Sequence, residues 1–169
     1  MRRFGIIGLG LLLLTLTACE GTSFQSSVPA YPVHAEIDVE RLFVDFTPEN
    51  IGAYITVDKD GYKKKGTFVI PTPATDAWGY GGVLVYVSMV NDNNPYLSYD
   101  AYDLACPYCA SRGKKSPCTI DGMYAVCPEC GEQYDVGGGY AIPCKGKINE
   151  TLRRLNILPS GKKLTITQR

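Results

Sequence analysis

The most informative part of this chain reads Cys106-Pro107-Tyr108-Cys109, then seventeen further residues, then Cys127-Pro128-Glu129-Cys130-Gly131. Each C-x2-C pair directs its two sulfurs toward one point, and an intervening hairpin brings the two pairs together. This spacing is typical of a four-thiolate site, whose tetrahedral geometry suits a zinc ion or a single iron ion. The pattern therefore predicts a small two-knuckle metal-binding subdomain with four ligands: Cys106, Cys109, Cys127 and Cys130.

The composition of the 169-residue chain excludes several classes of protein. Its 17 basic and 17 acidic side chains cancel, so no positive surface for nucleic acid is expected. It has a single histidine, which excludes any site that needs two imidazole ligands from this chain. The motifs of serine hydrolases, P-loop nucleotide-binding proteins and dinucleotide-binding domains are also absent, so we do not expect an enzyme.

The rest of the chain has the pattern of an all-β sandwich or barrel. Apolar and polar residues alternate from Val33 to Val39, as in a half-buried strand, which puts His34 on the polar face. The run 82–90 is apolar on both faces, as in a central strand. We expect one β domain over residues 32–169, with the metal-binding loops at about 104–145. Further strands are expected at 52–57, 67–70, 96–102 and 163–167, and a short helical segment at 148–155.

The N-terminus has the features of a secretory signal. Arg2-Arg3 precede an apolar run from Phe4 to Leu14, which is too short to span a bilayer. The end of the signal, Leu16-Thr17-Ala18-Cys19, resembles a bacterial lipobox. This resemblance implies cleavage after residue 18 and attachment of diacylglycerol to Cys19. We therefore expect residues 1–18 to be a lipoprotein signal peptide.

Residues 19–31 are mostly small and polar and are expected to form a tether between the anchor and the domain. Lipidation of Cys19 places the protein in the cell envelope. The outer membrane is the expected site, because Glu20 is not the aspartate that retains many lipoproteins at the inner membrane. The lipid membrane is the one partner that the sequence predicts. No feature of the sequence indicates a protein or redox partner.

Three segments surround the cysteine pairs: Gly79-Tyr80-Gly81-Gly82-Val83-Leu84-Val85-Tyr86, Tyr99-Asp100-Ala101-Tyr102-Asp103-Leu104-Ala105-Cys106-Pro107, and Cys127-Pro128-Glu129-Cys130-Gly131-Glu132-Gln133-Tyr134-Asp135 followed by Gly138-Gly139 and Pro143. With these segments the chain resembles the Rieske iron–sulfur domains, and especially the Rieske-like lipoproteins of the Bacteroidetes. In that family one loop supplies Cys-x-His, the other Cys-x-x-His, and both hold a 2Fe-2S cluster. The resemblance implies a Rieske-like β sandwich or barrel over roughly the last two-thirds of the chain.

Two ligands of that family are missing here. Matched by position, Cys106 and Cys127 fall on the family's cysteine ligands, whereas Tyr108 falls on the first histidine and Cys130 on the second. His34 lies 72 residues before Cys106 and does not replace them. The resemblance therefore implies the fold, but not the Rieske cofactor with its two histidine ligands.

Three interpretations of the four cysteines stay open. A four-thiolate zinc, or a single iron in the same geometry, is favoured by the knuckle spacing and implies a structural or binding role, because four thiolates leave no open position on the ion. An all-cysteine 2Fe-2S cluster would make the protein an electron-transfer module. Disulfides would make it a stapled envelope protein without metal, because an exported chain meets an oxidising compartment.

Seven cysteines are an odd number. A lipidated Cys19 and four metal ligands leave Cys118 and Cys144, which could form a disulfide across 26 residues of sequence or remain two buried thiols. In Rieske domains the segment around Pro143 covers the cluster loops, and this resemblance makes Cys144 a candidate extra ligand.

Overall fold

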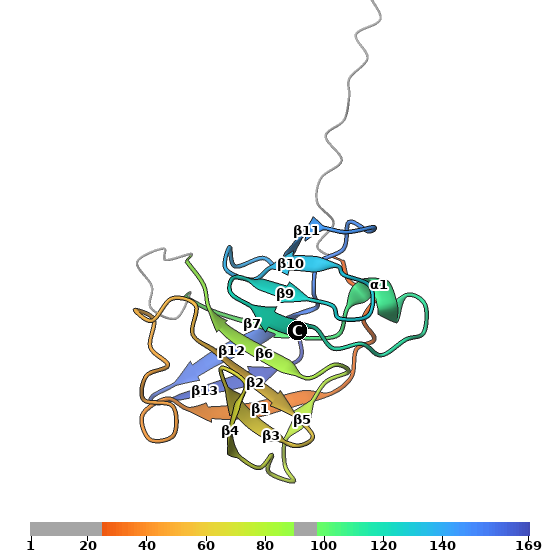
Figure 1. Ribbon diagram of the computed structural model, residues 1–169. Helices are drawn as coiled ribbons and strands as arrows, with labels where there is room; N and C mark the ends of the chain where they lie inside the picture. The colour runs from red at the N-terminus through yellow and green to blue at the C-terminus, as the bar shows by residue number, and fades with distance from the viewer. Residues whose placement is uncertain (1–24, 90–97) are drawn as a thin grey trace, which may run out of the picture.

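The structure is a computed structural model that describes residues 25–89 and 98–169 (Figure 1). These residues form thirteen strands and one helix of four residues, and the paired strands are antiparallel. The all-β class predicted from the sequence is confirmed. The elements are β1 (Val33–Asp38), β2 (Tyr54–Asp58), β3 (Gly61–Lys64), β4 (Thr67–Ile70), β5 (Ala77–Trp78), β6 (Val83–Val87), β7 (Tyr99–Asp103), α1 (Pro107–Ala110), β8 (Thr119–Asp121), β9 (Tyr124–Val126), β10 (Gln133–Asp135), β11 (Ile142–Lys145), β12 (Arg154–Ser160) and β13 (Lys163–Thr167).

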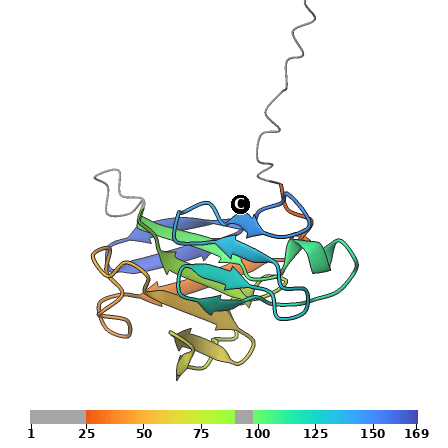
Figure 2. The same cartoon turned by 45° about the horizontal axis from the view of Figure 1, so that its top comes forward.

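The strands form two sheets. The larger has nine strands in the order β4-β3-β2-β6-β7-β12-β13-β1-β5, and the smaller has four in the order β11-β10-β9-β8. The smaller sheet and α1 lie between β7 and β12 in the sequence, so they form an inserted subdomain that carries both cysteine pairs. This cysteine subdomain, predicted from the two knuckles, lies against one side of the larger sheet (Figures 1 and 2).

Strand β6 lies between two hydrophobic cores. All five of its residues are buried. Val83, Val85 and Val87 belong to the core of the large sheet, whereas Leu84 and Tyr86 belong to a second core under the cysteine subdomain. The strand is apolar throughout because both of its faces are covered. The prediction of a central strand in this run is therefore confirmed.

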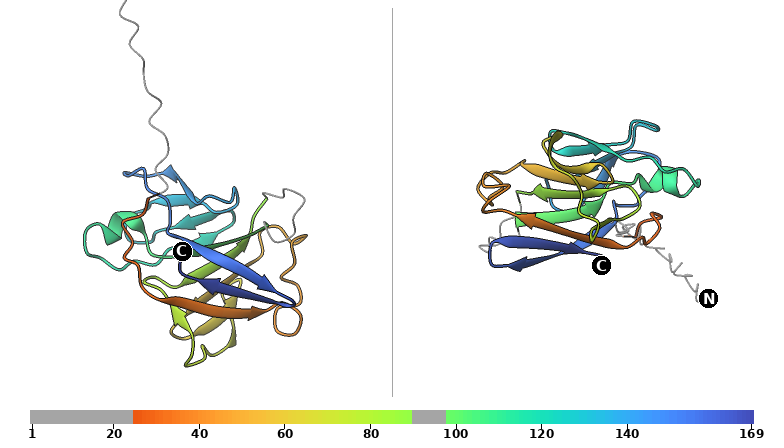
Figure 3. Two further views of the ribbon diagram at one scale, coloured as in Figure 1. Left: turned by 180° about the vertical axis from the view of Figure 1, so that it is seen from behind. Right: turned by 90° about the horizontal axis from the view of Figure 1, so that it is seen from below.

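Strand β1 has the predicted alternation, with Ala35 and Ile37 buried and His34 exposed. It pairs with β13 on one side and with β5 on the other. The two ends of the nine-strand order come close together, since Gly66 in the β3–β4 turn and Trp78 in β5 line the same cavity. The large sheet is therefore strongly curled (Figure 3), as the predicted sandwich or barrel requires.

Residues 25–31, the described part of the predicted tether, pack on the domain. The Val28 side chain is 1% exposed, and its carbonyl accepts a hydrogen bond from Arg153 Nε at 2.9 Å. The backbone N–H and the hydroxyl of Ser27 donate to the carboxylate of Glu150. The folded unit thus extends further toward the N-terminus than residue 32, because the segment before β12 provides partners for this part of the chain.

The short helix expected at 148–155 is not formed, and this prediction was wrong. Arg154 and Leu155 begin β12 instead, where they pair with Tyr102 and Ala101 of β7. The rest of β12 pairs with β13. Hydrogen bonds to two neighbouring strands outweigh a weak local preference for helix, because a single helical turn is unfavourable on its own. Within the described residues, no helix is long and apolar enough to cross a membrane.

Candidate metal centre

The structure brings the four predicted ligands together. Cys106 precedes α1 and Cys109 lies within it, whereas Cys127 follows β9 and Cys130 lies in the turn before β10. All four Sγ atoms lie within 4.8 Å of one another. The Sγ–Sγ distance is 3.6 Å between Cys106 and Cys130, and 3.8 Å between Cys109 and Cys127. Each of these two close pairs joins one sulfur from each knuckle.

Proline and glycine shape the two knuckles. Pro107 occupies the first turn of α1, where its missing N–H has no helical partner to lose, and the single helical turn brings Cys109 back toward Cys106. Gly131 has φ +78°, a conformation that glycine adopts without strain, and its N–H donates to the Cys127 carbonyl at 3.0 Å. The two C-P-x-C motifs therefore encode the turns as well as the ligands.

The sulfur spacing fits one metal ion. Four sulfurs arranged tetrahedrally at about 2.3 Å from a zinc ion lie about 3.8 Å from one another. The two closest contacts of the cluster, at 3.6 and 3.8 Å, agree with that spacing. In a 2Fe-2S cluster a second iron and two sulfide ions separate the pairs of cysteines, so that sulfurs on different irons lie further apart than sulfurs on one ion. The observed compactness, within 4.8 Å for all four, fits a single ion better.

Two hydroxyl groups lie beside the ligand sulfurs. The Tyr134 hydroxyl is 3.5 Å from Cys106 Sγ, and the Ser116 hydroxyl is 3.3 Å from Cys127 Sγ. Both side chains are buried, and an O–H donor stabilises a thiolate ligand and orients it. Tyr134 lies in a segment of the Rieske resemblance, but nothing in the sequence pattern singled out Ser116.

The pKa of each cysteine in the cluster depends on how deeply it is buried and on its hydrogen bonds. Hydrogen bonds from the Cys118 thiol, the Tyr134 hydroxyl and the Cys109 backbone N–H lower the pKa of Cys106 to about 4, although burial opposes them. Burial raises the pKa of Cys109 to about 11 and also raises the pKa of Cys130. Cys106 is therefore the sulfur best prepared to be a thiolate before an ion binds.

Tyr108, the residue at the position of the first Rieske histidine, stabilises the outer side of the cluster. Its ring is nearly buried, and the Arg112 guanidinium lies 4.0 Å and the Lys147 ammonium 5.2 Å from its centroid. With Lys114, these cations line a depression of about 270 Å³ next to Cys109 and Cys130. Lys114 is ion-paired with Glu129, so Arg112 and Lys147 are the cations that offset the negative charge that four thiolates leave around a divalent ion.

Glu132 connects the loop after β11 to the second knuckle. Its side chain is 1% exposed, its Oε1 accepts from the Lys147 backbone N–H at 2.6 Å, and its own backbone N–H donates to Cys130 Sγ. A Cβ atom on Gly146 would lie 1.7 Å from Glu132 Oε2, so a side chain there would displace this buried carboxylate. This contact keeps Lys147 over the Tyr108 ring.

Asp103 holds a second loop against the first knuckle. Its buried carboxylate accepts from the backbone N–H groups of Tyr80 (2.6 Å), Gly81 (2.8 Å) and Ala105 (2.9 Å). A Cβ on Gly81 would lie only 2.2 Å from Ala105 N. The glycine-rich segment 79–82 therefore packs directly against the residue that precedes the first ligand.

The structure does not bring Cys118 and Cys144 together. Cys118 precedes β8 at one edge of the small sheet, and Cys144 lies in β11 at the other edge. Three strand spacings of about 4.8 Å separate the two edges, which is beyond the reach of a disulfide. The described cysteines are free thiols, so the disulfide proposed for this pair is not supported.

The positions of these two thiols also correct the expected extra ligand. Cys144 is exposed, and its Sγ contacts the Gln133 carbonyl at 3.5 Å. Cys118 is buried in the same core as the ligands and follows Pro117, which pairs with Ala105 just before the first ligand, so it is the additional thiol near the cluster. His34 lies on the exposed face of β1 and belongs to neither knuckle. The predicted lipidation site, Cys19, lies outside the described residues.

No protein-family model matches the chain, and no curated protein matches it. Among solved structures, the chain is similar to a chain of the "Complex of reduced oxygenase and oxidized ferredoxin in carbazole 1,9a-dioxygenase". The two are 12% identical with a TM-score of 0.41, over 80% of this chain and 93% of that chain. A similarity of this size assigns neither a family nor an activity.

Proposed function

We propose that this protein is a lipid-anchored lipoprotein of the cell envelope whose Rieske-like β domain holds one metal ion, zinc, on Cys106, Cys109, Cys127 and Cys130. The compact sulfur cluster is the observation that carries the proposal. The hydroxyl and backbone donors around it add support, because groups of this kind orient metal-bound thiolates.

The role that fits this site is structural or binding rather than catalytic. Four thiolates saturate a tetrahedral ion, and no position remains on it for a substrate. The cluster joins the two loops of a small subdomain whose strands have only three or four residues. Sheets this small have little independent stability, so a bound ion would hold the two loops together.

The lipid anchor is supported by the lipobox at residues 16–19. Six positions separate Cys19 from Gln25, which spans about 20 Å when fully extended. A domain that begins at residue 25 would therefore stay close to the surface of the membrane. Radiolabelled palmitate incorporation into the wild-type chain, and its loss in Cys19→Ala, tests this part.

Native mass spectrometry of the full chain, purified without reductant, tests the metal site. We expect one zinc ion per chain, loss of that ion in Cys127→Ser, and its retention in the matched control Cys144→Ser. A 2Fe-2S cluster with visible absorbance would keep the four ligands but replace the structural role with electron transfer, for which the partly exposed Cys130 offers the nearest route to a partner. One mononuclear iron would keep both the site and the structural role, with iron in place of zinc. A metal-free protein with its cysteines in disulfides would overturn the proposal.

A further inference from the structure

An open cleft that contains three arginines lies beside the first described residues of the chain. Its volume is about 560 Å³, and the residues that line it are Gln25, Ser26, Arg153, Arg154 and Arg169. The Arg154 and Arg169 side chains are exposed, and Arg153 is half-buried. None of the lining side chains is a carboxylate, so this arginine cleft is positively charged.

Strand pairing brings two of the arginines together. Asn156 of β12 lies opposite Thr167 of β13, and the Asn156 side-chain amide donates to the Gln168 carbonyl at 3.2 Å. Two residues further along, the same register places Arg154 opposite Arg169. Like charges that face each other on paired strands repel, so an anion bound between them would relieve the repulsion.

The other contacts of the cleft hold the arginines in place without neutralising all of them. Arg154 donates to the buried carboxylate of Asp100 at 2.7 Å and lies 5.7 Å from the centroid of the Tyr140 ring. Arg153 donates through Nε to a backbone carbonyl. Among the described residues, no carboxylate side chain forms an ion pair with Arg153 or Arg169. With Asp100 and the terminal carboxylate of Arg169 counted, the three guanidinium groups still leave a net positive charge.

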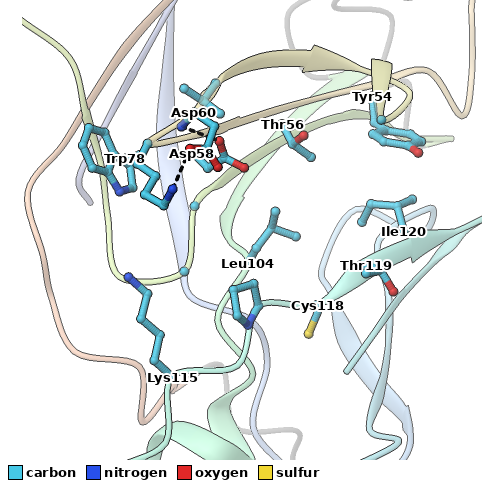
Figure 4. Close-up of a pocket in the computed structure, with 16 residues that line it drawn as sticks. Tyr54, Thr56, Asp58, Asp60, Trp78, Leu104, Lys115, Cys118, Thr119 and Ile120 are labelled. Atoms are coloured by element: carbon cyan, nitrogen blue, oxygen red, sulfur yellow. Dashed lines mark hydrogen bonds and ion pairs between the residues drawn. The ribbon is translucent and has the colours of Figure 1, made fainter. Parts of the chain in front are cut away.

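Two other places with several charges differ from this cleft. At the hairpin end of β12 and β13, Lys162 and Lys163 each form an ion pair with a glutamate. Figure 4 shows a second cavity, whose lining includes Asp58 and Asp60, and Lys59 at that cavity pairs with Asp60. The cations at both places have carboxylate partners within the chain. The arginine cleft instead offers its charge to a ligand from outside.

The cleft adjoins the segment that leads to the proposed lipid anchor. The Gln25 carbonyl accepts from the Thr151 N–H at 3.3 Å, and six positions separate Gln25 from Cys19. Because an extended chain of that length spans about 20 Å, an anchored protein keeps this cleft near the membrane surface. The anionic groups concentrated at such a surface are the headgroups of acidic phospholipids.

We propose that the arginine cleft binds the phosphate of an anionic phospholipid headgroup and thereby holds this end of the domain on the membrane. This inference rests on the lipid anchor of the proposed function and adds the group on the membrane that the folded domain recognises.

The chemistry of the cleft suits this ligand. Each planar guanidinium donates two parallel hydrogen bonds to phosphate oxygens, a geometry that a lysine ammonium does not provide. A headgroup with a net negative charge, such as phosphatidylglycerol, is attracted in full, whereas the choline cation of phosphatidylcholine offsets the attraction. The exposed Tyr140 ring beside Arg154 fits the same location, because tyrosine is enriched at membrane–water interfaces.

Native mass spectrometry of the lipidated protein tests the cleft, with the protein released from detergent micelles that hold equal amounts of phosphatidylglycerol and phosphatidylcholine. We expect one retained phosphatidylglycerol per chain, about tenfold more abundant than retained phosphatidylcholine. Arg169→Gln should lower this retention about tenfold, the loss expected for one charge-assisted hydrogen bond. The matched control is Lys163→Gln, which removes one positive charge at the other end of β13 and should retain phosphatidylglycerol as wild type does.

A second variant separates the geometry of the cleft from its charge. Arg154→Lys keeps a cation for the buried Asp100 carboxylate but removes the pair of parallel hydrogen bonds. Retention of phosphatidylglycerol should therefore fall in this variant too, while circular dichroism shows an unchanged fold.

Equal retention of the two lipids, or wild-type retention in Arg169→Gln, would overturn the inference. Displacement of the lipid by an equal concentration of inorganic phosphate would overturn it as well, because the site would then recognise free phosphate. The proposed function fails separately, if Cys19 carries no lipid. In that case the same micelles still present both headgroups to the chain, so the preference for phosphatidylglycerol decides the inference by itself.

Discussion

At the scale of single residues, the metal centre depends on groups that are not ligands. Tyr134 and Ser116 place hydroxyl groups 3.5 and 3.3 Å from two ligand sulfurs. Asp103 fixes the position of the first knuckle through three backbone N–H groups. Removing these side chains should weaken the site without removing a ligand.

Tyr134→Phe should lower metal affinity about tenfold to a hundredfold, the range seen when a group that orients a ligand is lost. The ring stays buried in the second core, so the free energy of unfolding of the metal-free chain should change little. Competition with a chromogenic chelator measures the affinity. Tyr124→Phe, an exposed hydroxyl on β9, is the control, and equal affinities of the two variants would contradict the role of Tyr134.

Gly81→Ala should destabilise the fold by about 1–3 kcal/mol or more, because the new methyl group would overlap with the Ala105 backbone and force it to move. Ala105 precedes Cys106, so metal affinity should fall as well. Gly66→Ala is the comparison: it meets no atom within 4 Å but has φ +81°, and should cost only about 1–2 kcal/mol of backbone strain. Urea denaturation measures both, and metal affinity should change only in Gly81→Ala.

At the scale of elements, the segment before β1 is part of the folded domain. Val28 is buried, and Ser27 and Arg153 contribute hydrogen bonds that connect this segment to the residues before β12. The strands are stabilised by the hydrophobic side chains packed on their faces. Strand β6, for example, has one hydrophobic core on each face.

A chain that begins at residue 25 should therefore be as stable as the full chain, whereas one that begins at residue 32 should lose about 2 kcal/mol. Burial of one valine contributes about 1.5–3 kcal/mol, and the hydrogen bonds of Ser27 and Arg153 add to it. Urea denaturation followed by circular dichroism compares the two truncations. Equal midpoints would show that residues 25–31 contribute nothing to stability.

At the scale of the whole molecule, two units of different size share strand β6. The nine-stranded sheet has its own core, whereas the four-stranded sheet combines short strands with the cysteine cluster. Local stability should differ between the two, since it depends on buried apolar contacts and on the bound ion.

Removing the metal with a chelator should accelerate amide hydrogen exchange in β8 to β11 and in α1, while β1, β6 and β13 keep their protection. The small sheet loses the ion that joins its loops, but the large sheet loses none of its core. Hydrogen exchange followed by mass spectrometry resolves the two regions. Equal acceleration in both sheets would mean that the ion stabilises the molecule as a whole, and no acceleration in either would mean that it stabilises neither.

Much of this architecture follows from local sequence. The alternation in β1, the doubly apolar run of β6 and the two C-P-x-C turns each depend on neighbouring residues, and each was predicted correctly. The four cysteines were also recognised, because knuckle spacing is a local property that constrains where the sulfurs point.

What only the tertiary structure decided involves partners distant in sequence. Arg154 and Leu155 lie in a strand rather than in a helix because β7 pairs with them, and the strand then continues along β13. Counting cysteines suggested a pair of Cys118 and Cys144, but strand order puts them at opposite edges of the small sheet. A separate bridge between Ala105 and Pro117 brings Cys118 toward the first knuckle. Local sequence determines turns and alternation, whereas the contacts between separate strands depend on how the sheets close, which no single segment encodes.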